Sequence, residues 1–131
     1  GYLGDSVIGK WCNLGAGTSS SNIKNNAGPV RVYTPTGELE IGLKCGVIMG
    51  DYVRTSINSS INTGSVIGPS SVVFGTALTP RYIPPFSWGE EGITRYKWEK
   101  VVRDIEQWKA LKGDHMLADE LKMLDFLYQN Y

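Results

Sequence analysis

The 131-residue sequence has little cysteine and little histidine. Its two cysteines, Cys12 and Cys45, are too few for a disulfide framework. Both fall where a small side chain fits, so we expect buried free thiols in a reducing cytoplasm. The single histidine, His115, lies near the C-terminal end, and we predict that it is a surface residue.

The chain also lacks net charge and long apolar runs. Its 13 Lys and Arg balance its 13 Asp and Glu, so nothing favours binding to nucleic acid or to an anionic membrane. No apolar run approaches the roughly 18 residues of a transmembrane helix, and no signal peptide is visible. The sequence has no initiator Met and starts in mid-pattern at Gly1, so we expect a C-terminal fragment of a longer, cytoplasmic protein.

Composition changes sharply along the chain. Residues 1–89 hold 14 of the 16 glycines but only 10 of the 26 charged residues. Residues 90–131 hold the other 16 charges and two glycines. Two different kinds of structure therefore follow one another within what the length predicts to be one domain.

Residues 1–78 carry a repeat of six. The anchors are mostly aliphatic, and four positions after each one stands a small or β-branched residue. The anchors are Tyr2, Ile8 and Leu14, then Met49, Thr55, Ile61, Ile67 and Val73. This pattern predicts a mainly β fold, a parallel β-helix whose stacked coils bury the anchors. A phosphate-binding loop at Gly15–Thr18 is excluded because neither a Lys nor a helical pattern follows it.

The two runs of the repeat are out of phase. From Leu14 to Met49 is 35 residues, one short of a multiple of six. We therefore predict that the chain leaves the coil over about residues 19–42. Within this excursion, "VRVYTPTGELEIG" predicts two short strands around a turn at Thr34–Gly37.

The sequence of residues 79–131 predicts a linker and two helices. Residues 79–89 hold three of the six prolines and no period, so we expect an extended linker packed on the coil through Tyr82, Ile83, Phe86 and Trp88. One helical face then carries Trp98, Val101, Val102, Ile105 and Trp108. Gly113 ends that helix, and Asp114 is the expected N-cap of a second helix that buries Leu117, Leu121, Leu124 and Tyr128. We predict that residues 90–131 cap the open last coil; the alternative is a contact surface for another subunit.

The run from Tyr2 to Asn22, with "NLGAGT" and a following Asn, resembles the acetyltransferase domain of the bifunctional N-acetylglucosamine-1-phosphate uridylyltransferase/glucosamine-1-phosphate acetyltransferase family. The stretch "GLKCGVIMGDYVRTSINSSINTGSVIG" resembles the related bacterial and archaeal sugar-phosphate nucleotidylyltransferases more closely. The resemblance implies a left-handed parallel β-helix, a homotrimer, and acetyl transfer from acetyl-CoA to the amine of a hexosamine 1-phosphate. Mg²⁺ would serve only an upstream nucleotidylyltransferase domain.

The resemblance also implies roles for single residues. Tyr2, Asn13, Asn22 and Lys44 match sugar-phosphate positions. A second group, along the acetyl-CoA groove, consists of Ala16, Ile57 and Gly75. Two positions depart from the family pattern: Ile23 stands in place of a Tyr, and Ile57 in place of a Ser. The family's general-base His would fall three residues before Tyr2, ahead of Gly1, so no catalytic residue is assigned.

Alternatives stay open at this stage. The β-helix could be a non-catalytic trimerisation or regulatory domain of a sugar-1-phosphate nucleotidylyltransferase. From the residues alone, Tyr2 could be a repeat anchor, Asn13 a turn residue and Lys44 a solvated charge. A zinc hydratase on this fold would need three His ligands, so we set it aside and expect no metal site.

Overall fold

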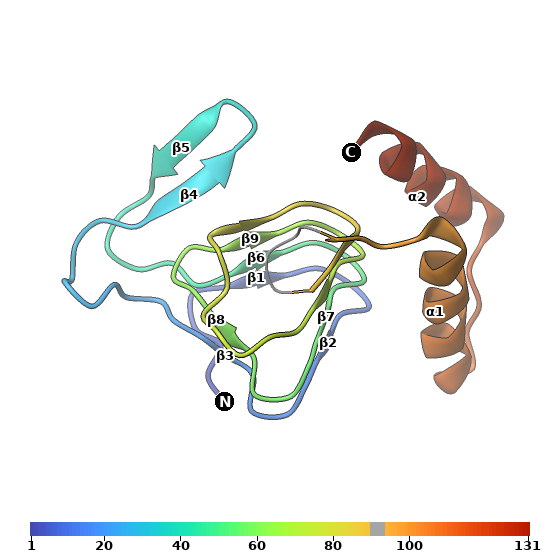
Figure 1. Ribbon diagram of the computed structural model, residues 1–131, viewed down its shortest axis with the longest axis horizontal. Helices are drawn as coiled ribbons and strands as arrows, with labels where there is room; N and C mark the ends of the chain where they lie inside the picture. Colours follow the sequence, from blue (N-terminus) through green and yellow to red (C-terminus); the bar gives the residue numbers. More distant parts are fainter. Residues whose placement is uncertain (90–93) are drawn as a thin grey trace.

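A coil of short parallel strands forms the larger part of the computed structural model, which describes residues 1–89 and 94–131 (Figure 1). Strands that follow one another along the coil belong to different sheets, and the chain turns through three faces before it returns to the first. The arrangement is a parallel β-helix. The prediction of a mainly β chain with two helices is confirmed.

We number the three faces in the order in which the chain reaches them. Face 1 is a parallel sheet of β1 (Val7–Ile8), β6 (Ile48–Met49), β9 (Val66–Ile67) and β11 (Tyr82–Ile83). Face 2 is formed by β2 (Asn13–Leu14), β7 (Arg54–Thr55), β10 (Val72–Val73) and β12 (Ser87–Trp88), with β13 (Thr94–Arg95) antiparallel at its edge. Face 3 is formed by β3 (Ser19–Ser20) and β8 (Ser60–Ile61).

The core lies inside the coil, where the anchors stack on one another. Ile8 is in register with Met49, and Met49 with Ile67. The fully buried members of this core are Val47, Met49, Val53, Ile61, Ile67, Val73 and Ile83. Backbone hydrogen bonds join the coils, as where Val7 N donates to the Val47 carbonyl at 2.9 Å. Each coil thus buries the apolar face and satisfies the amides of its neighbour.

Residues 79–89 are a further coil rather than a linker. β11 pairs in parallel with β9, and β12 with β10. The turn between β11 and β12 contains Pro84, whose carbonyl accepts a hydrogen bond from Ser71 Oγ at 2.9 Å. A Cβ atom at Gly68 would lie 2.3 Å from the Pro85 nitrogen, so the coils touch closely here. Prolines in the turn hide the repeat from sequence inspection without preventing the stacking.

The excursion begins later than expected. Residues 19–20 remain in the coil as β3, which pairs with β8. Cys45 N donates to the Asn22 carbonyl at 2.9 Å and closes the loop. Between these residues the predicted hairpin is confirmed, as β4 (Arg31–Thr34) paired antiparallel with β5 (Gly37–Glu40). The hairpin projects from the coil (Figure 1).

The two helices are α1 (Trp98–Leu111) and α2 (Ala118–Asn130). Gly113 follows α1 with a φ of +71°, as expected of a residue just past a helix end. The N-cap of α2 is Leu117 and not Asp114. Leu117 and Leu121 are exposed, contrary to expectation, whereas Leu124 is buried. In the described residues, neither helix combines the length and the apolarity needed to cross a membrane.

The helices lie beside the coil rather than over its last turn (Figure 1). They pack on the corner between faces 1 and 2, where four coils place a residue at the same position: Trp11, Tyr52, Ser70 and Phe86. We call these four residues the aromatic corner. All four have a φ between +55° and +64°, a region unfavourable for residues other than glycine. Burial of three aromatic rings against the helices offsets this backbone cost.

A buried ion pair joins α1 to α2 and contacts the aromatic corner. Lys109 of α1 is only 3% exposed. Its Nζ lies 3.0 Å from Glu120 Oε2 of α2. The same ammonium lies 5.2 Å from the centre of the Trp11 ring and 5.6 Å from that of Tyr52. Stacking on aromatic faces partly replaces the hydration that this cation loses on burial.

The docking of α2 can be tested by truncating one leucine. Leu124→Ala removes a side chain that is 1% exposed, and we expect a loss of about 2–5 kcal/mol in the free energy of unfolding. The exposed Leu117 of the same helix is the matched control, and Leu117→Ala should change stability by less than about 0.5 kcal/mol. Urea unfolding measures both. Equal effects would contradict the packing described here.

Candidate functional site

Tyr2 and Asn22, two of the residues matched to the sugar-phosphate site, meet in the structure. Asn22 Nδ2 donates to the Tyr2 hydroxyl at 3.1 Å and to Asp5 Oδ2 at 2.8 Å. Asp5 was not predicted from the sequence. We call Tyr2, Asp5 and Asn22 the acceptor cluster. It offers a hydroxyl, a carboxylate and an amide on an accessible surface.

Backbone bonds fix Tyr2 beside the first coil. Its carbonyl accepts from Ser20 N at 2.8 Å, and its amide donates to Ser19 Oγ at 3.2 Å. Leu3, and not Tyr2, is in register with Ser20. Tyr2 is 56% exposed and its hydroxyl lies over Gly4, where a Cβ atom would be only 2.1 Å from it. The side chain therefore faces outward, as binding to a ligand requires.

Lys44 directly precedes two residues whose backbones contact the acceptor cluster. The following residue, Cys45, bonds to Asn22 through its backbone, and Gly46 N donates to the Asp5 carbonyl at 2.7 Å. Lys44 is exposed, and none of the ion pairs among the described residues involves it. Its ammonium is therefore not engaged in an ion pair with any described side chain.

The pKa values of both cysteine thiols are raised. Burial, and then the charge of Asp5, raises the pKa of Cys45. Burial also raises the pKa of Cys12. Both cysteines are free, as predicted; Cys45 is buried and Cys12 half-buried. Raised pKa values keep both as neutral thiols near pH 7, which makes them poor nucleophiles.

The three residues matched to the acetyl-CoA groove form a column. The register of β2, β7 and β10 pairs Leu14 with Thr55 and Thr55 with Val73. Two residues beyond these, Ala16, Ile57 and Gly75 occupy the same place in successive coils. Asn58 N donates to the Ala16 carbonyl at 2.8 Å, which holds the first two coils together here. All three residues are exposed at the corner between faces 2 and 3. We call them the donor column.

Asn13 lies away from the acceptor cluster. It is in β2, in register with Arg54 on the outer side of face 2. The acceptor cluster instead flanks the far edge of face 3, beyond β3. From Ala16 to Asn22 is six residues, a span of at most about 20 Å. Tyr2 itself lies beside Ser19 and Ser20 of β3, so the acceptor cluster adjoins face 3.

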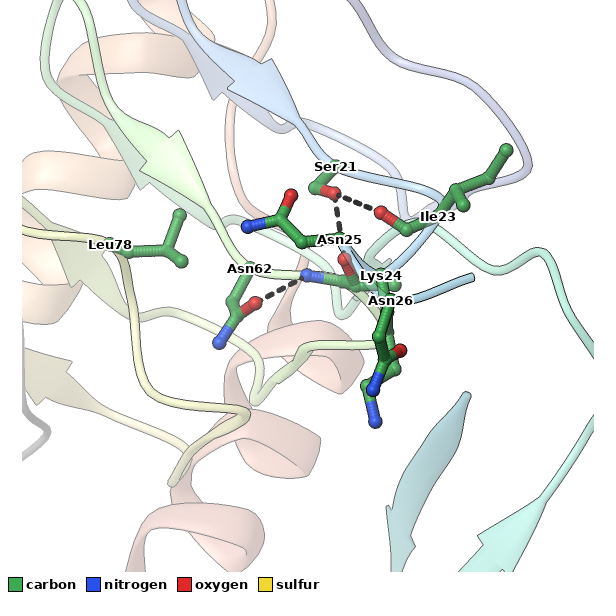
Figure 2. Close-up of a pocket in the computed structure, with 8 residues that line it drawn as sticks. Ser21, Ile23, Lys24, Asn25, Asn26, Asn62 and Leu78 are labelled. Atoms are coloured by element: carbon green, nitrogen blue, oxygen red, sulfur yellow. Dashed lines mark hydrogen bonds between the residues drawn. The ribbon is translucent and has the colours of Figure 1, made fainter. Parts of the chain in front are cut away.

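A cavity of about 330 Å³ opens beside Ser21 and Ile23, where the excursion begins (Figure 2). Its lining is mostly polar and consists of Ser21, Ile23, Lys24, Asn25, Asn26, Asn62, Thr63 and Leu78. Thr63 Oγ1 donates to Ser21 Oγ at 2.7 Å, and Ser21 Oγ donates to the Ile23 carbonyl at 3.1 Å. Apart from Ile23, the sequence did not single out these residues. The polar run after Asn22 was the available signal.

Face 2 carries a charged network that reaches α1. Arg54 Nη2 donates to the Tyr96 hydroxyl at 2.9 Å, and that hydroxyl donates to Asp104 Oδ2. Burial, and then the bond to Asp104, raises the pKa of Tyr96 to about 12. Burial alone would raise the pKa of Asp104, but bonds from Tyr96 and Arg103 hold it below its usual value. At neutral pH the network is a cation, a neutral phenol and an anion.

No metal centre is evident in the part of the chain that the structure describes. Residues 1–89 and 94–131 bring together no group of three or more His, Cys, Asp or Glu side chains that could hold an ion. His115 is exposed, as predicted.

The fold defines a parallel β-helix protein, and comparison with curated proteins confirms the resemblance to bifunctional transferases. The chain is a relative of the bifunctional GlmU proteins. It is 38% identical to "Bifunctional protein GlmU" of Methanocaldococcus jannaschii over 82 residues, 63% of this chain and 20% of that protein. It is 36% identical to the GlmU of Methanococcus maripaludis over 101 residues, 77% of this chain and 23% of that protein.

A third relative carries a broader name. The chain is 36% identical over 81 residues to "Bifunctional sugar-1-phosphate nucleotidylyltransferase/acetyltransferase" of Sulfurisphaera tokodaii, covering 61% of this chain and 20% of that protein. The matches thus span about a fifth to a quarter of the length of these relatives. No family model matches the chain.

The raised pKa of Tyr96 predicts a loss of stability in alkali. Between a pKa of about 10 in the unfolded chain and about 12 in the folded one, only the unfolded state has lost the proton. The contribution is therefore complete below pH 10 and is lost as pH rises towards 12. Urea unfolding at pH 8 and pH 11 measures it. Tyr96→Phe should show a smaller fall between the two; an equal fall would refute the assignment.

Proposed function

We propose that this chain is a C-terminal acetyltransferase domain of a sugar-phosphate nucleotidylyltransferase. It transfers the acetyl group of acetyl-CoA to the amine of a hexosamine 1-phosphate, a step towards UDP-N-acetylglucosamine. The observation that supports the proposal is the hydrogen bond between Tyr2 and Asn22, two residues that the resemblance assigns to the sugar-phosphate site. The name of the Sulfurisphaera tokodaii relative, which includes both activities, supports it.

The acceptor side suits an aminosugar phosphate. The ammonium of Lys44 would bind the phosphate as a point charge. Tyr2 and Asn22 offer a hydroxyl and an amide for sugar hydroxyls and for the reacting amine. Asn22 is already oriented by its bonds to Tyr2 and Asp5, so little ordering is needed on binding.

The donor side suits a long, thin ligand. Small residues at Ala16 and Gly75 leave the backbone accessible, and a column along the coil axis matches an extended pantetheine arm. Acetyl-CoA supplies the activated thioester. The free amine attacks the thioester carbonyl, the C–S bond breaks, and CoA leaves as a thiol. The proton that the amine loses needs a base, which we place in a His upstream of Gly1.

The proposal includes a left-handed coil and a homotrimer, both of which the resemblance implies. In such a trimer, a neighbouring subunit would complete each site. Mg²⁺ belongs in this scheme only to an upstream nucleotidylyltransferase domain. The two free thiols suit the reducing cytoplasm that we propose as the location.

A non-catalytic role is the second candidate, and one observation favours it. Ile57 is 68% exposed in the middle of the donor column, where a small side chain would leave more room for a ligand. Ile23 is also exposed, beside Asn22. Two outward isoleucines at ligand positions would suit packing against another subunit, as in a trimerisation or regulatory domain.

The variant Lys44→Ala distinguishes a role of Lys44 in sugar-phosphate binding from a role in folding. We expect Lys44→Ala to weaken glucosamine 1-phosphate binding at least tenfold, because it removes the cation that faces the phosphate, and to leave acetyl-CoA binding within about twofold. Isothermal titration with each ligand measures the two affinities. Lys122→Ala, an exposed lysine of α2, is the matched charge control and should change neither. An equal loss of both ligands in Lys44→Ala would indicate a folding defect and refute the role.

The donor column is tested by titrating acetyl-CoA into the chain, with its mass in solution measured alongside. We expect one site per subunit in a trimer. Ile57→Ser should bind acetyl-CoA more tightly and Ile57→Trp more weakly, because the side chain at this position stands in the ligand's path. A well-folded trimer that binds no acetyl-CoA, in either the native or the Ile57→Ser form, would favour the assembly role instead.

A further inference from the structure

A second cavity lies between face 2 and α1, away from both the donor column and the acceptor cluster. Its volume is about 320 Å³, which is within the range of small-molecule sites. Its lining is Arg54, Asp104, Gln107, Trp108 and Leu111. Four of these five residues come from α1, so this helix builds most of the cavity and the β-helix supplies its arginine.

The Arg54 side chain is oriented by a hydrogen bond and forms no ion pair with the described side chains. Its guanidinium donates to the Tyr96 hydroxyl at 2.9 Å and lies 5.6 Å from the centre of the same ring. The Tyr96 hydroxyl is bonded in turn to Asp104. None of the ion pairs among the described residues includes Arg54. Its remaining N–H donors form a pre-oriented fork of the kind that binds phosphate oxygens.

Trp108 provides a flat apolar surface next to this cation. Trp108 and Arg54 together line a smaller cavity beside Tyr52 as well, so the indole and the guanidinium are neighbours. Trp108 is 36% exposed, although the helical pattern predicted its burial. A large ring that is not covered by the core and stands over a cavity is suited to pack on the face of a ligand ring.

The polar residues of the cavity suit hydroxyl groups. Asp104 offers a carboxylate, and Gln107 offers an amide that both donates and accepts. A carboxylate would repel a phosphate placed beside it, but it accepts well from sugar hydroxyls. The charges therefore indicate an orientation, with the anionic group of the ligand at Arg54 and its hydroxyls along α1.

We propose that this cavity binds a phosphate-bearing sugar, with the phosphate on Arg54, the ring against Trp108 and the hydroxyls on Asp104 and Gln107. Asn13 shares the outer side of face 2 with Arg54, in register with it, so its amide is placed to extend the same site. The shared chemistry, a ring with hydroxyls and a phosphate, is found both in free hexose phosphates and in the ribose phosphate of nucleotides. The inference does not depend on acetyl transfer.

The test is a binding measurement on the full chain. Glucosamine 1-phosphate, glucose 1-phosphate, UMP and inorganic phosphate are titrated separately by calorimetry. With the preferred sugar phosphate, Arg54→Ala should weaken binding at least tenfold and Trp108→Ala at least threefold. Lys122→Ala is the charge control, because Lys122 is exposed on α2, takes part in none of the ion pairs among the described residues and does not line the cavity. It should change affinity less than twofold.

The outcomes separate the sources and the alternatives. The site is supported if binding of either the hexose phosphates or UMP is weakened by both Arg54→Ala and Trp108→Ala. The ligand that binds identifies whether the site accepts a hexose or a nucleotide. The proposal is overturned if inorganic phosphate binds as tightly as any sugar phosphate. It is also overturned if Trp108→Ala leaves the affinity for the sugar phosphate unchanged. Because the acceptor cluster is also proposed to bind glucosamine 1-phosphate, the titrations are repeated in the Lys44→Ala chain. A Lys44→Ala chain that binds none of these ligands overturns the second site, whereas loss of acetyl-CoA binding alone concerns only the proposed acetyl transfer. Circular dichroism of each variant confirms that the fold is retained.

Discussion

Register between successive coils is the constraint on which the rest of this structure depends. Each coil donates backbone hydrogen bonds to the next, and the side chains inside and outside stack at the same spacing. Stacking at strand distance turns positions that are far apart in sequence into columns. The inner column is the core, and the outer columns are the donor column, the row that joins Asn13 to Arg54, and the aromatic corner.

The aromatic corner determines where α1 and α2 pack on the coil. Trp11, Tyr52 and Phe86 occupy turn positions with a positive φ, which costs free energy that an isolated coil would not recover. The helices recover it by covering the rings, and the buried Lys109–Glu120 pair joins both helices at the same place. Docking on a side of the coil leaves the outer surface of face 2 beside α1, which is how the second cavity arises.

Local patterns predicted the elements well and their packing poorly. The hairpin and the end of α1 followed from a turn signal and from Gly113, because both depend on neighbours in sequence. The coil at residues 79–89 was missed because its prolines interrupt the repeat, although Ile83 still stacks on Ile67. Leu117 and Leu121 were expected to be buried because helical spacing gives a face but does not say which part of it another element covers.

By itself, the sequence determined that a repeat of six builds a parallel coil, that an excursion with a hairpin interrupts it, and to which proteins the chain is related. It also indicated Tyr2 and Asn22, whose contact the structure shows. Only the tertiary structure decided that Asn13 lies beside Arg54 on another face, and that α1 joins Arg54 to Trp108. The physical reason is that these neighbours meet across coils and across the helix–coil contact, where register and packing, rather than spacing along the chain, set which side chains face one another.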